Sequence, residues 1–343
     1  MTDEKLTIGF LGNGRSANRY HIPYLLVRKD KFRIKTICAR NPENSAWKRL
    51  ADAAYTADLD GMLNDPELDL IVVATHMESH FDLVRRVLES GKNCVCEKPF
   101  TPTAAQAEEL FALARQRGVM LQCYQNRRFD SDFLTMQKVI ESGRLGDIFG
   151  VELHFDYYRS EVPEKSTRFD PAQTFLFGYG CHMLDQVISY FGVPERVQYD
   201  VRQLLGCGHM NDYFDLDLFY GDKKVSIASS YFRVKGRPSV VVYGTRGTFL
   251  KDSADKQEQH LKMFYFPGNP DFGVDTPSEY GVLSYYDNVG DYHEERAPSE
   301  VGNYGRYYDT VYQTLVCGAP PLVKPEETIV QLRILEKGLE GLS

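Results

Sequence analysis

The fold class is decided near the start of the chain by the stretch Leu6-Thr7-Ile8-Gly9-Phe10-Leu11-Gly12-Asn13-Gly14-Arg15-Ser16-Ala17. A short apolar run, which predicts a strand, leads into a G-x-G-x-x-A turn and then into a segment of helical composition. In such a turn Gly12 permits the tight bend, Gly14 lets the backbone approach a pyrophosphate, and Ala17 lets the helix pack close to the sheet. The free amides at the start of the helix would then face the phosphates. The stretch therefore predicts a dinucleotide-binding unit whose cofactor-binding residues are Gly12, Asn13, Gly14, Arg15, Ser16 and Ala17.

Strands and helices continue to alternate up to about residue 126. The expected strands after the first are Phe32–Cys38, Leu70–Ala74, Asn93–Glu97 and Val119–Tyr124. The expected helices between them are Ser45–Ala53, Ser79–Ser90 and Thr103–Arg117. Leu70–Ala74 is apolar throughout, which is typical of a strand buried on both faces of a parallel sheet. Because strands separated by helices favour a parallel sheet with right-handed crossovers, we expect residues 1–126 to form a Rossmann-type NAD(P)-binding domain.

The second half of the chain shows a period of two, the pattern of half-buried strands. The alternating runs are Phe149–Tyr158, Val197–Leu205, Tyr213–Tyr220, Lys224–Arg233, Ser239–Lys251 and Leu261–Phe266. Turn residues between these runs favour an antiparallel sheet. Residues 267–300 are rich in Pro, Gly, Asp and Tyr, and we expect them to form a long surface loop. The predicted fold class is therefore α/β: a Rossmann domain, then residues 127–343 as an α+β domain with a large, mostly antiparallel open sheet for substrate binding and oligomerisation.

Composition excludes several classes of protein. With 43% hydrophobic and 26% charged residues, the chain matches ordinary globular proteins. A formal net charge of −8 argues against a nucleic-acid binder, which normally carries a basic face. The apolar runs are too short to span a bilayer, and the polar start does not resemble a secretory signal. Seven scattered cysteines predict free thiols, so we expect a cytoplasmic protein with neither a membrane nor a nucleic-acid partner.

The end of the second expected strand bears on the choice of nucleotide. An acid at this place binds the ribose 2′-hydroxyl of NAD, whereas a nearby arginine accommodates the 2′-phosphate of NADP. The chain reads Cys38-Ala39-Arg40-Asn41, without an acid. We therefore expect NADP(H) to be preferred through Arg40, with Arg15 as a second contact, and NAD(H) to remain possible. The alternative is that Arg40 is a solvated surface side chain.

Cys96-Glu97-Lys98-Pro99 follows the strand Asn93–Glu97. Ligands of doubly wound sheets bind at the carboxyl ends of the strands, so this segment is placed to meet one. The amine of Lys98 can hold a hydroxyl or carbonyl oxygen and assist its proton transfer. By itself the tripeptide Glu97-Lys98-Pro99 could equally be a surface turn. Cys94 and Cys96 share one face of the strand without a matching Cys or His pair, so we expect them to pack in the core and expect no metal.

The chain resembles the glucose–fructose oxidoreductase, inositol dehydrogenase and rhizopine catabolism family (Gfo/Idh/MocA). The resemblance runs over nearly the whole chain and is strongest to an uncharacterised enterobacterial branch. The motifs that carry it are Gly12-x-Gly14-x-x-Ala17, His21-Ile22-Pro23, Ala74-Thr75-x-x-x-x-His80, Gly91-Lys92, Glu97-Lys98-Pro99, Gln125-Asn126-Arg127-Arg128-Phe129-Asp130, His154-Phe155-Asp156-Tyr157-Tyr158-Arg159, Gly180-x-His182-x-x-Asp185, Gly318-Ala319-Pro320 and Pro325-Glu326-Glu327.

The resemblance implies roles for individual residues. Lys98 would be the catalytic lysine, and Glu97 would support the cofactor ribose and the nicotinamide. His182 would face the substrate as an acid/base or orienting group, for which a pKa near neutrality suits histidine. The residues implied to line the cofactor channel are Thr75, His76 and His80. The residues implied on the substrate side are Asn126, Tyr179, His182 and Asp185.

Plainer alternatives stand beside these roles, and the family pattern is broken at two positions. His182 could be a buried structural histidine, and we expect His21 and His80 to be structural or cofactor-adjacent. Gly178 stands where many members carry an aspartate that pairs with the histidine. His76 stands where proline is usual.

The function implied is an NAD(P)-dependent dehydrogenase or reductase acting on CH–OH groups of a sugar, polyol or related small molecule, with Lys98 assisting the proton. Two alternatives stay open. One is a non-catalytic NADP-binding sensor or transcriptional regulator, and the other is an NAD(P)-dependent glycosidase acting by transient oxidation. We expect a homodimer or homotetramer formed through the C-terminal sheet.

Overall fold

The computed structural model describes residues 5–43 and 46–343, and the chain divides into two compact units. The first unit contains Met1–Asn126 together with two later stretches, His260–Phe272 and Tyr304–Ile329. The second unit contains Arg127–Gln259, Gly273–Asn303 and Val330–Ser343. Within the described part of the chain, none of the helices is long and apolar enough to cross a membrane.

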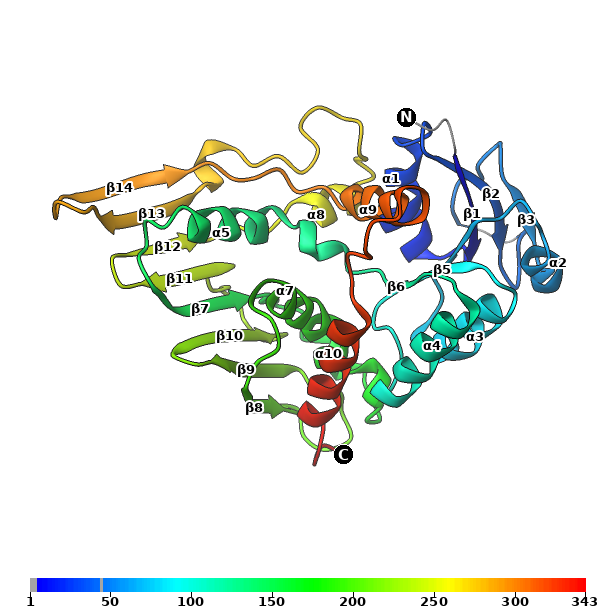
Figure 1. The fold of residues 1–343 in the computed structure, drawn as a ribbon. Coiled ribbons are helices and arrows are strands. Elements are labelled where there is room, and N and C mark those ends of the chain that lie inside the picture. The colour runs from blue at the N-terminus through cyan, green and yellow to red at the C-terminus, as the bar shows by residue number, and fades with distance from the viewer. Residues whose placement is uncertain (1–4, 44–45) are drawn as a thin grey trace. The chain divides into compact units, whose positions relative to one another are not determined.

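The first unit is built on a parallel sheet, which confirms the expected Rossmann-type fold (Figure 1). Its strands are β1 (Leu6–Leu11), β2 (Phe32–Cys38), β3 (Ala54–Thr56), β4 (Leu70–Val73), β5 (Asn93–Cys96) and β6 (Leu121–Cys123). They lie in the order β3-β2-β1-β4-β5-β6, so the strand order reverses between β1 and β4. All four side chains of β4 are buried, as its apolar sequence predicts.

Helices connect these strands. They are η1 (Ala17–His21, a π-helix), α1 (Ile22–Leu26), α2 (Leu59–Leu63), η2 (Met77–Ser79), α3 (His80–Glu89) and α4 (Ala104–Arg117). Helix α9 (Gly305–Cys317), from a later stretch of the chain, also belongs to this unit. The helix expected over Ser45–Ala53 is wrong for residues 46–53, which form turns and bends; Ser45 lies outside the described residues. None of the residues 46–53 is buried, so no apolar face holds this short segment as a helix.

The second unit contains a large sheet that is antiparallel except for the parallel pair β7–β10, as expected. Its strands are β7 (Ile148–His154), β8 (Arg196–Arg202), β9 (Tyr213–Tyr220), β10 (Lys223–Ser230), β11 (Val240–Gly244), β12 (Gly247–Lys251), β13 (Gly281–Tyr286) and β14 (Tyr292–Ala297). Their order is β14-β13-β12-β11-β7-β10-β9-β8. Helices α5 (Ser131–Glu141) and α7 (Cys181–Phe191) pack on this sheet.

The remaining elements are short, apart from the last helix. They are η3 (Asn126–Phe129), α6 (Glu161–Glu164), η4 (Pro171–Gln173), η5 (Leu176–Gly180, a π-helix), α8 (Gln257–Lys262), η6 (Pro277–Glu279) and α10 (Pro325–Gly338).

Two expectations about the second half were wrong. Leu261–Phe266 forms the end of α8 and a turn in place of a strand. The expected loop 267–300 contains the hairpin β13–β14, which extends the sheet. The sequence of β14, Tyr-His-Glu-Glu-Arg-Ala, is polar on both faces and almost fully exposed, so the alternation that marks a half-buried strand is missing.

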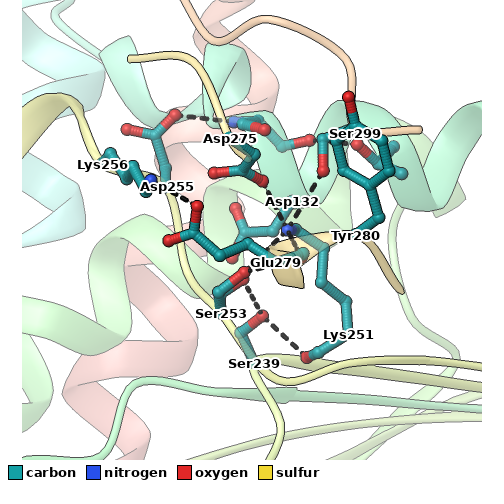
Figure 2. Close-up of polar contacts among 12 residues, drawn as sticks. Asp132, Ser239, Lys251, Ser253, Asp255, Lys256, Asp275, Glu279, Tyr280 and Ser299 are labelled. Atoms are coloured by element: carbon teal, nitrogen blue, oxygen red, sulfur yellow. Dashed lines mark hydrogen bonds and ion pairs between the residues drawn. The ribbon is translucent and has the colours of Figure 1, made fainter. Parts of the chain in front are cut away.

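A buried lysine ties β12 to the segment before β13 in the second unit (Figure 2). The side chains of Lys251 and Asp275 are fully buried, and their charged atoms lie 2.6 Å apart. The Lys251 ammonium also donates to the Ser253 hydroxyl, at 2.8 Å, and to the Glu279 carbonyl oxygen, at 2.9 Å. Because an ammonium has three protons to donate, these contacts satisfy the buried charge and fix the loop against the sheet.

Two further carboxylates, Asp132 and Asp255, lie close to this network (Figure 2). Burial raises the pKa of Asp132 to about 6, and the neighbouring Asp255 carboxylate raises it as well. Burial also raises the pKa of Asp255 above its usual range. Burial therefore favours the protonated, neutral form of both carboxyl groups.

Candidate functional site

The glycine turn joins β1 to η1 in the first unit. Gly12 has a φ of 109°, and a Cβ atom there would lie 2.4 Å from the carbonyl oxygen of Ala74, so only glycine fits. A Cβ atom at Gly14 would meet nothing within 4 Å, which leaves this part of the backbone open to a ligand. Ala17 is fully buried beneath the turn. These positions match what the sequence motif requires for a pyrophosphate.

A cavity of about 1170 Å³ lies at the carboxyl ends of the parallel strands. The predicted cofactor residues that line it are Gly12, Gly14, Arg15, Ser16, Arg40, Thr75, His76, Glu97 and Lys98. Lining residues that sequence reasoning did not single out include Tyr20, Leu59, Ser79, Asp82 and Leu83. The cavity opens where the strand order reverses, between β1 and β4, which is the usual ligand position in a doubly wound sheet.

The end of β2 contributes Cys38, Ala39 and Arg40 to the cavity wall. Arg40 is exposed at this end, and Arg15 is exposed at the glycine turn. Both guanidinium groups belong to side chains that line the same cavity, so both are available to an anionic group bound there.

Two of the predicted cofactor residues lie beside the cavity. Asn13 accepts a hydrogen bond from the side-chain amide of Asn18, at 2.9 Å. His80 is buried, with ring nitrogens 3.0 Å from the carbonyl oxygen of Pro99 and 3.2 Å from that of Thr75. Burial lowers the pKa of His80, which favours the neutral form of its ring, and the ring contacts the backbone at the ends of both β4 and β5.

The Glu97 carboxylate, at the cavity wall, accepts three hydrogen bonds. Its Oε1 accepts hydrogen bonds from the Ser16 hydroxyl and from Nε2 of His21, the latter at 2.9 Å, and its Oε2 accepts from the Lys98 amide at 2.9 Å. Burial alone raises the pKa of this carboxyl, but the hydrogen bond and charge of His21, the charge of Lys98 and the Ser16 hydroxyl together lower it to about 2. Glu97 is therefore a fixed negative charge at the end of β5.

Lys98 follows Glu97 and lines the cavity with a partly exposed side chain, and the Lys98–Pro99 peptide bond is cis. The Glu97–Lys98 pair thus presents a carboxylate and an amine at one end of the cavity. Arg40 lies at the end of a different strand, on the other side of the glycine turn.

The predicted substrate residues, except Asn126, lie in the second unit. His182 and Asp185 are buried on α7. Both carboxylate oxygens of Asp185 accept hydrogen bonds from the guanidinium of Arg128, at 2.7 and 2.8 Å. Asp185 is therefore committed to a two-pronged ion pair, which fixes α7 to the start of this unit. Asn126 is buried at the end of the first unit.

Tyr179 belongs to an aromatic cluster in the second unit. Its ring centroid lies 5.0 Å from that of Tyr157, 5.0 Å from that of Phe175 and 6.1 Å from that of Tyr231. The neighbouring Gly178 lies in the π-helix η5, and a Cβ atom there would meet nothing within 4 Å. The loss of the usual aspartate at this position is therefore not imposed by lack of space.

The two strand cysteines pack as the sequence suggests. Cys94 and Cys96 are fully buried, and burial raises the pKa of the Cys96 thiol well above its usual range. Over residues 5–43 and 46–343, no group of three or more His, Cys, Asp or Glu side chains is arranged to hold a metal ion.

The sequence predicted His21 to be structural or cofactor-adjacent but did not indicate Tyr308, the residue that contacts its ring. His21 sits fully buried between Glu97 and Tyr308, and its Nδ1 lies 2.6 Å from the Tyr308 hydroxyl. His21 is the last residue of η1, the π-helix that follows the glycine turn. No sequence signal identified Tyr308, because it lies 287 residues away on α9.

Comparisons with known proteins agree with this geometry. Residues 6–125 match the model of the oxidoreductase family with an NAD-binding Rossmann fold, and residues 137–341 match the model of its C-terminal alpha/beta domain. The chain is 46% identical to the uncharacterised oxidoreductase YhhX of Escherichia coli, over 98% of this chain and 97% of YhhX. A crystal structure of YhhX covers 98% of this chain and 97% of its own, with a TM-score of 0.93.

A second relative has an assigned activity. The chain is 32% identical to the scyllo-inositol 2-dehydrogenase (NADP(+)) IolW of Bacillus subtilis, over 98% of this chain and 94% of IolW. The structure of the oxidoreductase YvaA of Bacillus subtilis, 32% identical, superposes with a TM-score of 0.89 over 98% of this chain and 97% of its own. With both domain models matched and the Gly12–Ala17, Glu97-Lys98-Pro99 and His182 motifs in place, this chain belongs to the Gfo/Idh/MocA family of oxidoreductases.

Proposed function

We propose that this protein transfers a hydride between a nicotinamide cofactor, with NADP(H) preferred, and a hydroxyl- or carbonyl-bearing carbon of a sugar, polyol or related small molecule. One observation carries the proposal. A single cavity of the first unit is lined by the glycine turn, by Arg40 and by the Glu97–Lys98 pair. This is the set of groups that a phosphorylated dinucleotide and a reacting oxygen require.

The residues along the cavity support a binding position for each part of a dinucleotide. The open backbone at Gly14 and the helix start that follows would hold the pyrophosphate. Arg40, at the end of β2, would take the ribose 2′-phosphate, with Arg15 beside the turn. The remaining end of the cavity, with Thr75, His76 and Glu97, would then take the nicotinamide half.

The bound nicotinamide supplies the hydride chemistry, and the protein supplies the proton. In the oxidation direction the amine of Lys98 accepts the proton of the substrate hydroxyl, and in the reduction direction its ammonium returns a proton to the carbonyl oxygen. We assign His182 to the substrate as an acid/base or orienting group, with Asn126, Tyr179 and Asp185 in its surroundings. The NADP(+)-dependent polyol dehydrogenase IolW supports both the cofactor and the substrate class.

We also propose that the second unit forms the oligomer, a homodimer or homotetramer, through its sheet, and that the reaction takes place in the cytoplasm. The strands β8 and β9 have many half-exposed side chains, which a second sheet could cover. Light scattering or sedimentation of the purified protein tests the assembly.

The experiment that tests the reaction is an absorbance screen at the reduced-nicotinamide band. It should cover sugars, polyols and keto-sugars, with NADP(H) and NAD(H), in both directions. We expect at least one polyol or sugar to be turned over, faster with NADP(H), and Lys98→Met to abolish the signal. A protein that binds cofactor but turns over no substrate would favour a sensor, and turnover without net cofactor consumption would favour a glycosidase.

A further inference from the structure

His21 and Tyr308 form a buried chain that ends on Glu97. His21 is fully buried, its ring stacks on Tyr124 with centroids 3.9 Å apart, and Tyr308 is fully buried as well. Nδ1 of His21 lies 2.6 Å from the Tyr308 hydroxyl, and Nε2 lies 2.9 Å from Oε1 of Glu97. The imidazole therefore has a defined partner on each side.

The carboxylate decides how the imidazole is protonated. Because an ionised carboxylate only accepts hydrogen bonds, Nε2 must carry a proton and donate it to Glu97. In the neutral ring Nδ1 then accepts a hydrogen bond from the Tyr308 hydroxyl. Burial raises the pKa of Tyr308 well above its usual range, so this hydroxyl keeps its proton. The Tyr308 hydroxyl thus occupies Nδ1, so Nε2 is the ring nitrogen that donates to Glu97.

The negative charge held in this way faces the end of the cavity that the proposed function gives to the nicotinamide. The ring is cationic when the cofactor is oxidised and neutral when it is reduced. A fixed negative charge beside the ring would favour the oxidised form by roughly tenfold or more at the effective dielectric of a protein. Without its hydrogen-bond donors, the Glu97 carboxyl would have its pKa raised by burial and would be partly protonated.

We propose that His21 and Tyr308 are positioning residues that hold Glu97 as a fixed counter-charge for the oxidised nicotinamide, and that this raises the affinity for oxidised over reduced cofactor. The inference rests on the proposed function, since it requires a nicotinamide in the cavity. It goes beyond that function because it assigns a role to a residue of α9 and makes the oxidised-to-reduced affinity ratio a property of three side chains.

Other groups near Glu97 stay constant across the test. The titratable side chains that interact with it are His21 and Lys98, with Cys96 on β5, His80 on α3, Tyr124 after β6 and Tyr308 on α9. Burial raises the pKa of Tyr124 well above its usual range and lowers the pKa of His80, so burial favours the neutral form of both. Between pH 6 and pH 8, therefore, a pH-dependent change in the NADP⁺-to-NADPH affinity ratio of a His21 variant reports on the charge of Glu97.

The test measures dissociation constants for NADP⁺, for NADPH and for 2′,5′-ADP, which lacks the nicotinamide. Glu97→Gln should weaken NADP⁺ about tenfold or more and NADPH at most about twofold, with 2′,5′-ADP unchanged. His21→Leu should change the ratio in the same direction. Because it removes the donor, the pKa of Glu97 should rise, and the ratio of NADP⁺ to NADPH affinity should then increase with pH where the wild-type ratio is flat. His21→Gln, which keeps an N–H near the Nε2 position, should restore most of the ratio.

Tyr308→Phe keeps the ring and loses only the hydroxyl, so it should shift the ratio in the same direction by about two- to fivefold, the loss of one hydrogen bond. Tyr307→Phe is its matched control. That hydroxyl is equally buried and donates to the Cys123 carbonyl oxygen at 2.9 Å, and its loss should leave the ratio unchanged.

The results separate the inference from the function on which it rests. If Glu97→Gln and His21→Leu weaken NADP⁺ and NADPH equally while 2′,5′-ADP still binds, the counter-charge is wrong and the proposed function stands. If Tyr307→Phe shifts the ratio as much as Tyr308→Phe, the tautomer argument is wrong. If the wild-type protein binds neither dinucleotide, the proposed function is overturned and the inference with it.

Discussion

The two units treat buried carboxylates in opposite ways. In the first unit Glu97 receives hydrogen bonds from a hydroxyl, an imidazole and an amide, and these lower its pKa to about 2 at the wall of a cavity. In the second unit burial raises the pKa of Asp132 to about 6, and the nearby Lys251 ammonium is already paired with Asp275. Burial acts on both acids, so the difference comes from the donors that converge on Glu97.

The Glu97 carboxylate is a charge at a cavity wall, where a ligand can meet it. The Lys251 and Asp275 charges pair with each other inside the second unit. Substitutions at the cavity of the first unit should therefore change binding and turnover but leave stability nearly unchanged. Substitutions in the Lys251 network should change stability and leave binding unchanged.

The largest effect is expected for Lys98→Met. Turnover of the substrate found in the screen should fall about 10²- to 10⁴-fold, because the proton has no positioned donor or acceptor. Cofactor dissociation constants and the melting temperature should stay near wild type. Steady-state kinetics and thermal unfolding measure the two effects, and a variant with wild-type turnover would remove Lys98 from the mechanism.

Lys251→Met should cost about 3–5 kcal/mol of unfolding free energy, because it leaves the Asp275 carboxylate buried without its cation. Urea unfolding measures the loss. The matched control is Lys256→Met, which breaks the more exposed pair with Glu279 and should cost under about 1 kcal/mol. A double substitution, Lys251→Met with Asp275→Leu, should recover much of the stability, and NADPH affinity should be unchanged in all three variants.

Arg40→Asp should weaken NADPH about 10- to 100-fold, the worth of a hydrogen-bonded charge pair, and should leave NADH unweakened. Fluorescence titration gives both dissociation constants. Arg49→Asp is the control, since Arg49 is exposed and its guanidinium pairs with Glu43 outside the cavity lining. An unchanged NADPH affinity would make Arg40 an ordinary surface side chain.

The smallest effect is expected for Asp132→Asn. The folded-state pKa of about 6 lies above the usual value of 3.8, so ionisation of Asp132 destabilises the folded protein as pH rises through this range. The variant should melt a few degrees higher than the wild type at pH 7, a difference of about 1–2 kcal/mol, and the two should converge near pH 4. Equal melting temperatures at both pH values would show that Asp132 carries no such penalty.

The sequence predicted what is encoded locally. The Gly12–Ala17 turn and the Glu97-Lys98 pair each lie within a few residues of the strand that positions them, so residue type and order were enough. The π-helices η1 and η5, which carry His21 and Tyr179, could not be distinguished from ordinary helices by periodicity, although π-helices often mark functional sites.

Long-range packing could not be predicted in the same way. The Asp185–Arg128 ion pair and the His21–Tyr308 contact join residues 57 and 287 positions apart, and nothing in either local sequence indicates its partner. The exposed strand β14 was missed for the complementary reason: hydrogen bonds to β13 hold it, and its side chains carry no pattern.

The contribution of α9 to the first unit has a consequence for synthesis. When a ribosome has released only the first 126 residues, all six strands of the parallel sheet exist, but Tyr308 does not. His21 therefore lacks its contact with the Tyr308 hydroxyl until about two hundred more residues have been made and the second sheet has emerged. The parallel sheet is therefore translated well before Tyr308, and the contacts of His21 at the cavity wall are completed only after α9 has been made.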